Sequence, residues 1–185
     1  FYEHGSGGPA IVFVNPIVYG LATFQPLLER LCQEFPQLTV FAGSERVANV
    51  ATGSADVPLA VLGWAGRRGH DVRVVGLDLR DPAQVVGLAD SVAARGSLDI
   101  IINNAGYTWD SVIQKMTDDQ WHAIIDLHLK APFDILRAAQ PVISAAAKRE
   151  KAEGRVVHRK VVNISSVAGV FGNAGQANYS SAKAG

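Results

Sequence analysis

A serine, a tyrosine and a lysine near the end of the chain suit proton transfer at a carbonyl or an alcohol. Tyr179 and Lys183 are four residues apart, so on a helix both side chains point to the same face. A phenol has a pKa of about 10, and a fixed ammonium one helical turn away would stabilise its phenolate. The Ser166 hydroxyl could hold a substrate oxygen in line with that proton. Tyrosine and lysine also occur at this spacing on ordinary surface helices, so the pair alone does not define a site.

The residues around these three predict a strand, a loop and a helix in succession. The β-branched run that starts at Val161 indicates a buried strand, and a Gly- and Asn-rich loop follows it. The Ala- and Ser-rich stretch that contains Tyr179 and Lys183 is typical of a helix start. Ser166 then lies where the strand ends, which is the edge at which open α/β sheets bind ligands.

Strand and helix patterns alternate along the rest of the chain. Short apolar runs predict further strands at residues 10–14, 38–42, 71–77 and 99–102. Helical spacing covers residues 20–35, 83–95 and 121 to about 149, and Pro132 and Pro141 should bend the last of these. This alternation predicts a doubly wound, three-layer α/β fold with a mostly parallel sheet of the Rossmann type.

Composition favours one compact domain over residues 1–185 and disfavours several functional classes, and the βαβ pattern at the start of the chain predicts that this domain binds a dinucleotide. The chain is 48% hydrophobic, and its 17 basic residues balance 17 acidic ones, so no global field favours nucleic acid or an anionic membrane. The charged segment Lys148–Lys160 mixes both signs without aromatic residues and is therefore expected to be a solvated loop. A single cysteine, Cys32, fits a reducing cytoplasm, and the five histidines lack metal-ligand spacing.

The string from Ser166 to Lys183, together with Asn103-Asn-Ala-Gly106, resembles the short-chain dehydrogenase/reductase family. This resemblance implies that Tyr179 is the general acid/base and that Lys183 stabilises its phenolate and anchors the nicotinamide ribose. It also implies that Ser166 orients the substrate oxygen. In the family the chain continues with two more strands and a substrate-covering segment, so this sequence is expected to be incomplete at its C-terminus.

The family's glycine-rich phosphate turn falls on residues 15–22, where Asn15 and Gly20 match it. Pro16 departs from the pattern because it removes an N–H and fixes φ where the family has glycine. At the end of the second strand, Ser44 and Arg46 would suit the 2′-phosphate of NADP, although the neighbouring acidic residue would oppose it. The resemblance therefore favours NADP slightly over NAD, and Arg46 as a plain solvated residue stays an alternative.

Further cofactor contacts follow the third and fourth strands. The resemblance places Asp78 and Leu79 beside the adenine, with the Asp78 carboxylate accepting from the adenine amino group. Asp78 could instead simply cap the following turn. The small residues Ala105 and Gly106 permit close approach of the cofactor, and Asn103 can tie adjacent strand ends together.

His128 stands where many family members have a catalytic asparagine that orders a water for the proton relay. A neutral imidazole can hold a water as an amide does, and a purely structural histidine is the alternative. The same replacement occurs in the dehydrogenase units of peroxisomal multifunctional β-oxidation enzymes, which this stretch resembles. It favours a 3-oxoacyl or 3-hydroxyacyl thioester as the substrate of an NAD(P)-dependent oxidoreductase.

Other interpretations of the chain are weaker. Residues 4–15 are similar to the opening strand of α/β-hydrolases, but the Gly-x-Ser-x-Gly elbow of that fold is absent. Thr52-Gly53 copies the start of the phosphate turn without the glycines that should follow. The main alternative to an enzyme is a catalytically silent Rossmann-type piece, either an interaction module or an incomplete gene product, and both Pro16 and the early end of the sequence motivate it. By analogy with the family, homodimers or homotetramers would form on the helices of Trp121 and Tyr179.

Overall fold

The computed structural model describes residues 10–14, 39–44, 72–94 and 96–185. Their strands form a five-stranded, all-parallel sheet in the order β3-β2-β1-β4-β5. The strands are β1 Ala10–Val14, β2 Thr39–Ser44, β3 Val72–Gly76, β4 Ile100–Asn103 and β5 Lys160–Asn163. This order confirms the predicted doubly wound α/β fold, with the topological switch between β1 and β4. The helix predicted over residues 20–35 lies outside the described residues.

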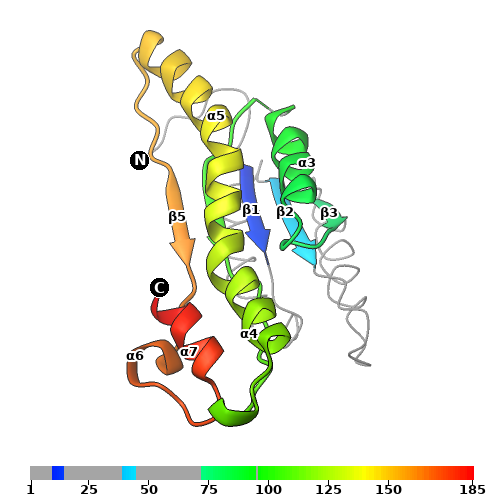
Figure 1. The fold of residues 1–185 in the computed structure, drawn as a ribbon. Helices are drawn as coiled ribbons and strands as arrows, with labels where there is room; N and C mark the ends of the chain where they lie inside the picture. Colours follow the sequence, from blue (N-terminus) through cyan, green and yellow to red (C-terminus); the bar gives the residue numbers. More distant parts are fainter. Residues whose placement is uncertain (1–9, 15–38, 45–71, 95) are drawn as a thin grey trace.

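The helices of the described residues surround one face and one end of this sheet (Figure 1). Helices α3 and α5 pack against each other on the same face, whereas α4, α6 and α7 lie toward the carboxyl ends of the strands. Their bounds are α3 Pro82–Ala93, α4 Asp118–Ile125, α5 Ala131–Ala152, α6 Val167–Phe171 and α7 Ala177–Ala184. A short 3-10 turn, η1 Ile113–Lys115, precedes α4.

Two predicted helix starts are confirmed by their capping contacts. An Asp81 carboxylate oxygen accepts a 2.9 Å bond from the Ala83 N–H, with Pro82 at the first helical position. Thr117 and Gln120 form a reciprocal capping box at the start of α4. Each cap satisfies backbone N–H groups that have no partner within their own helix.

The helix predicted from Trp121 onward is not uniform. A π-turn, η2 Asp126–Lys130, separates α4 from α5, and the Ala131 N–H bonds back to the Asp126 carbonyl. Pro132 follows at once and has no N–H, so it cannot donate the bond that an α-helix would direct to the His128 carbonyl. The helix therefore accommodates Pro132 by widening into the π-turn that contains His128.

The hydrophobic core lies where α3 and α5 meet β4 and the segment that follows β3. Apolar side chains of α3 recur on its inner face, as the predicted periodicity requires. The most deeply buried large side chains of the core are those of Leu79, Val85, Val92, Ile101 and Leu127. This core fixes α5 against the sheet and so fixes the π-turn at the end of α5 nearest the carboxyl ends of the strands.

The prediction that the strand at Val161 is buried is wrong for the described structure. All four residues of β5 are exposed, and Val161 keeps 47% of its surface accessible. The reason is position, because β5 is the edge strand of the described sheet and pairs only with β4. A β-branched run predicts a strand, but it does not say whether other elements cover that strand.

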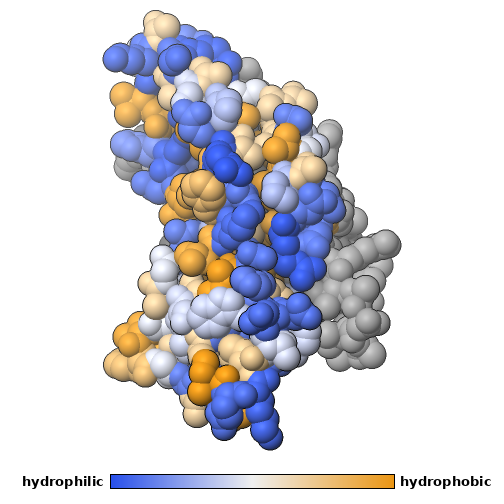
Figure 2. Space-filling model, viewed as in Figure 1, coloured by the Kyte–Doolittle hydropathy of each residue, from blue (hydrophilic) through white to orange (hydrophobic). Residues whose placement is uncertain are grey.

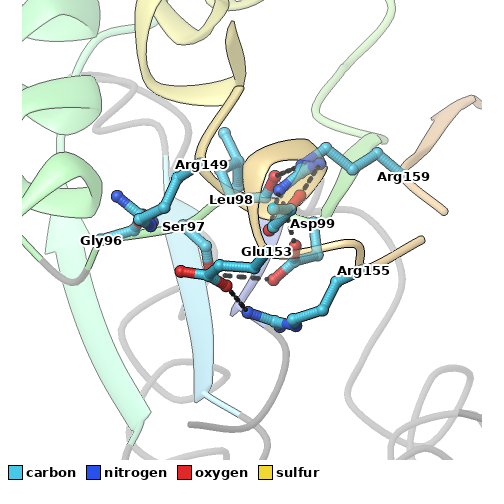
Figure 3. Close-up of polar contacts among 9 residues, drawn as sticks. Gly96, Ser97, Leu98, Asp99, Arg149, Glu153, Arg155 and Arg159 are labelled. Carbon is cyan, nitrogen blue, oxygen red and sulfur yellow. Dashed lines mark hydrogen bonds and ion pairs between the residues drawn. The ribbon is translucent and has the colours of Figure 1, made fainter. Parts of the chain in front are cut away.

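The charged segment Lys148–Lys160 is held by ion pairs near the amino ends of β4 and β5 (Figure 3). The Arg159 guanidinium donates to both carboxylate oxygens of Glu150, at 2.9 and 2.8 Å, and to the Leu98 carbonyl. It also lies 3.6 Å from an Asp99 carboxylate oxygen. Two arginines of this segment are thus paired with acidic side chains, Arg159 with Glu150 and Arg155 with Glu153.

Among the described residues, no helix has both the length and the apolar character needed to cross a membrane. The same residues contain no group of three or more potential metal-binding side chains.

Candidate functional site

Helix α7 presents Tyr179 and Lys183 on one face, as their spacing predicts. The Lys183 Nζ lies 5.8 Å from the centre of the Tyr179 ring. Both side chains are partly buried, and the helix that carries them, α7, lies beyond the carboxyl end of β5 (Figure 1).

The Lys183 head group is held by the segment that follows β5. Its Nζ donates a 2.6 Å bond to the Ile164 carbonyl. In return, the Ser165 hydroxyl donates a 2.7 Å bond to the Lys183 carbonyl. Burial lowers the pKa of the Lys183 ammonium from its ordinary value. Sequence reasoning missed Ser165, because a serine next to the candidate catalytic one carries no distinguishing signal.

Ser166 begins α6, and its Oγ accepts a 3.2 Å bond from the Ala168 N–H. Helix α6 packs closely on α7, since a Cβ added at Gly169 would lie 2.7 Å from the Lys183 carbonyl carbon. The packing brings the Ser166 segment beside Lys183, but in the described structure no hydrogen bond joins Ser166 to Tyr179.

His128 reaches the same place from the π-turn. Its ring stands perpendicular to the Tyr179 ring, with the centroids 5.0 Å apart. The Nε2 atom lies 2.8 Å from the Tyr107 carbonyl, and since a carbonyl can only accept, Nε2 carries the proton. Nδ1 is then left as an acceptor, and it is buried without a protein partner.

The position of His128 keeps its ring neutral. Burial is the main cause that lowers the pKa of His128 to about 4, and the charge of nearby Lys183 lowers it further. Gly106 leaves the space in which the His128 ring lies, because a Cβ at this position would lie 1.9 Å from His128 Cε1. The family resemblance explains Gly106 by close approach of the cofactor, and the structure adds a second reason, which is the space that the imidazole occupies.

Asp78 lies after β3 and is held by its neighbour. Arg80 donates to both carboxylate oxygens, at 2.9 and 2.8 Å, and the Arg80 N–H also donates to one of them. The Arg80 side chain accordingly lowers the pKa of the Asp78 carboxyl. Asp78 therefore does cap the local turn, as the alternative interpretation expects. Its carboxylate still has lone pairs that can accept from another donor. Leu79 is buried, with 2% of its surface exposed.

Asn103 ties the ends of two strands together, because its Nδ2 donates a 2.8 Å bond to Asn163 Oδ1. Its own Oδ1 is buried without a protein partner. Asn103 lines a cavity of about 270 Å³ together with Ala105, His128 and Lys183. Two unsatisfied acceptors, Asn103 Oδ1 and His128 Nδ1, therefore belong to residues that line one cavity.

Three of the predicted cofactor residues, Asn15, Gly20 and Arg46, lie outside the described residues. Ser44 is the last residue of β2, where it pairs in register with Gly76.

Comparison with known proteins agrees with this geometry. The family model described as short chain dehydrogenase matches residues 41–185. Acetoacetyl-CoA reductase of Acinetobacter sp. (strain RA3849) is 39% identical over 147 residues, which cover 79% of this chain and 55% of that protein. The 3-oxoacyl-[acyl-carrier-protein] reductase FabG of Escherichia coli (strain K12) is 34% identical over 148 residues, with 80% and 55% covered. This chain thus spans about half the length of the curated relatives it matches.

A solved structure supports the fold. The blue fluorescent protein from a metagenomic library, in complex with NADPH, superposes with a TM-score of 0.73 at 21% identity and covers 96% of this chain and 64% of its own. The parallel sheet, the segment from Ser166 to Lys183 and the match over residues 41–185 all agree, and the chain belongs to the short-chain dehydrogenase family.

Proposed function

We propose that the protein is an NAD(P)-dependent oxidoreductase that interconverts a secondary alcohol and a ketone, with a 3-oxoacyl or 3-hydroxyacyl thioester as substrate. The observation that carries the proposal is the meeting of a phenol, an ammonium and a neutral imidazole, from Tyr179, Lys183 and His128. The thioester class is supported by relatives that are named acetoacetyl-CoA reductase and 3-oxoacyl-[acyl-carrier-protein] reductase.

The residues present fit a nicotinamide dinucleotide on the side of the site that the structure describes. Asn103 and His128 have buried acceptors without protein partners, and both line the cavity next to Lys183. Lys183 and Tyr179 would hold the nicotinamide ribose, the backbone around Ala105 and Gly106 would lie against the cofactor, and Asp78 with Leu79 would hold the adenine. Asn15, Gly20, Ser44 and Arg46 would complete the phosphate end, with NADP preferred over NAD. The cofactor, when bound, supplies the hydride.

The proton chemistry belongs to the side chains of this chain. Tyr179 would give a proton to the developing alkoxide in reduction and take it back in oxidation. In this proposal the Lys183 ammonium would attract the negative charge that develops on the Tyr179 oxygen, and Ser166 would orient the substrate oxygen. His128 Nδ1 can accept a bond from a water, which makes His128 a candidate member of the relay that returns the proton to Tyr179.

We also propose a homodimer or homotetramer built on the helix that contains Phe133 and on the α6–α7 region. Phe133 on α5 is 57% exposed and Phe171 on α6 is 83% exposed. Figure 2 shows apolar side chains on the surface where α6 lies in Figure 1. Sedimentation velocity should give a dimer or a tetramer, and a monomer at all accessible concentrations would contradict this assembly. A cytoplasmic location stays a prediction from the single cysteine.

The decisive experiment combines cofactor binding with catalysis. Nicotinamide fluorescence would be followed as the protein is titrated with NADPH and NADH, and turnover would be measured with 3-oxoacyl thioesters and with simple ketones. Tyr179→Phe should lower kcat by about 100-fold or more while cofactor binding is retained. Ser181→Ala is the matched control, because this exposed serine on the same helix donates only to the Ala177 carbonyl.

Three results would contradict the proposal or a part of it. Absence of binding to either dinucleotide would favour the catalytically silent Rossmann-type module. Equal turnover by the parent and Tyr179→Phe would remove the phenol from the chemistry. Faster turnover of simple ketones than of any thioester would overturn the substrate class alone.

A further inference from the structure

Asn178, the residue before Tyr179, is the most deeply buried polar side chain of the described structure, with no exposed surface. A buried amide keeps its place only when its donors and acceptor are bonded. The partners of this side chain therefore show what it holds together.

The Asn178 amide bonds to three backbone groups from three segments. Its Nδ2 donates to the Trp109 carbonyl at 3.1 Å and to the Gln120 carbonyl at 3.0 Å. Its Oδ1 accepts from the Tyr179 N–H at 2.8 Å. Carbonyls only accept and an N–H only donates, so the orientation of the amide follows from its partners.

The bond to Tyr179 replaces a missing helix cap. Gln176 at the N-cap of α7 makes no side-chain capping bond, and the N–H groups of a first turn have no partner inside their own helix. Asn178 satisfies the N–H of Tyr179, so the backbone that carries the phenol is fixed at its own amide.

The other two bonds of Asn178 lead toward His128. Gln120 belongs to α4, which runs directly into the π-turn that contains His128. Trp109 lies two residues after Tyr107, whose carbonyl bonds the His128 ring. The same loop is held again by a 2.8 Å bond from the Ser111 N–H to the Gly175 carbonyl. One buried amide thus joins the helix of Tyr179 to both segments that locate His128.

We propose that Asn178 is a positioning residue that sets the first turn of α7 and holds the Tyr179 ring against His128. The inference deepens the proposed function and rests on it, since Tyr179 is there the proton donor. Asn178 touches neither substrate nor cofactor in this scheme and acts only through its neighbour.

Asn178→Asp is the most direct variant, because it keeps the shape and the acceptor for the Tyr179 N–H but cannot donate to either carbonyl. A displacement of about 1 Å can cost about 100-fold in rate, so we expect kcat for thioester reduction to fall by about 30- to 100-fold. KM and the Kd for NADPH should change much less than kcat, because Tyr179 is the only one of the proposed binding residues that the variant displaces. Asn173→Asp makes the same chemical change at an exposed asparagine and should stay within about twofold of the parent.

Amide hydrogen exchange tests the same assignment without relying on turnover. In the parent, the Tyr179 N–H should exchange as slowly as the Ser180 N–H, which has an ordinary helical bond to Gln176. In Asn178→Ser, which is too short to keep these bonds, the Tyr179 N–H should exchange at least about tenfold faster. If the aspartate variant does not fold, the parent comparison decides, and a Tyr179 N–H that exchanges about tenfold faster than that of Ser180 overturns the proposal.

The outcomes separate the two proposals. A folded Asn178→Asp protein with kcat within twofold of the parent refutes the positioning role and leaves the proposed function standing. A parent that reduces neither thioesters nor simple ketones refutes the proposed function, whereas the exchange rates still decide whether Asn178 anchors Tyr179.

Discussion

His128 should make the folded protein lose stability as the pH falls below about 6.5, the ordinary pKa of a histidine. In the folded state the pKa of His128 is lowered to about 4, chiefly by burial. The unfolded chain therefore binds a proton at a pH where the folded chain does not. The stability contributed by neutral His128 is complete above pH 6.5, and it is lost progressively as the pH falls toward 4.

The magnitude follows from the difference between the two pKa values. A difference of about 2.5 units corresponds to about 3 kcal/mol once both states are protonated, at 1.36 kcal/mol per unit. At pH 5 most of that difference is already expressed, and the loss relative to pH 7.5 is about 2 kcal/mol. Such a loss is large against the 5–15 kcal/mol that is typical of whole domains.

Urea unfolding of the parent and of His128→Asn at pH 7.5 and pH 5.0 would measure this loss. Other groups also titrate in this range, so the informative quantity is the extra loss in the parent, expected to be about 2 kcal/mol. His122→Asn is the matched control, because His122 is exposed on α4 and its replacement should leave the loss of the parent intact. Equal losses in the parent and in His128→Asn would refute the neutral, buried state of His128.

Three further changes test other contacts of the structure. Gly106→Ala should destabilise the fold by about 1–3 kcal/mol in thermal unfolding, because its Cβ would lie 1.9 Å from His128 Cε1. An unchanged melting temperature would show that the ring moves aside freely. Arg80→Ala should weaken NADPH binding about 3- to 10-fold, by releasing the carboxylate at the adenine end, and should leave binding of nicotinamide mononucleotide unchanged. Equal weakening for both ligands would exclude that route. Glu150→Gln should cost roughly 1–3 kcal/mol in urea unfolding, since Arg159 would lose the nearer of its two charged partners and keep only Asp99. Insensitivity of the variant and parent alike to added salt would count against the ion pair.

Local chemistry explains why much of the fold could be predicted from the sequence. The pair Asp81-Pro82 and the spacing of Thr117 and Gln120 each predict a helix start, because capping depends on residues within one turn. The shared face of Tyr179 and Lys183 follows from helical periodicity alone. These features need no knowledge of the rest of the chain.

The remaining features depend on contacts between distant residues. The sequence shows a histidine at position 128, but its tautomer is set by a carbonyl 21 residues away, at Tyr107. The anchoring of Lys183 by Ile164 is likewise a bond to a carbonyl, which every residue possesses and no motif marks. The exposure of β5 depends on which elements lie beside it, and the β-branched composition of its valines does not contain that information.

One physical effect, burial, acts on two bases of the site with different consequences. Burial lowers the pKa of both Lys183 and His128, because it disfavours their charged forms. The ordinary pKa is 10.5 for Lys183 and 6.5 for His128, and each side chain donates a proton to a backbone carbonyl, Lys183 to that of Ile164 and His128 to that of Tyr107. Under the proposed function, Lys183 would act as the cation beside Tyr179, whereas the His128 ring, with its pKa lowered to about 4, would be a neutral acceptor for a water. The two roles would come from the residue types together with their shared burial. Both roles depend on the position of Tyr179, whose ring centre lies 5.0 Å from that of His128 and 5.8 Å from Lys183 Nζ.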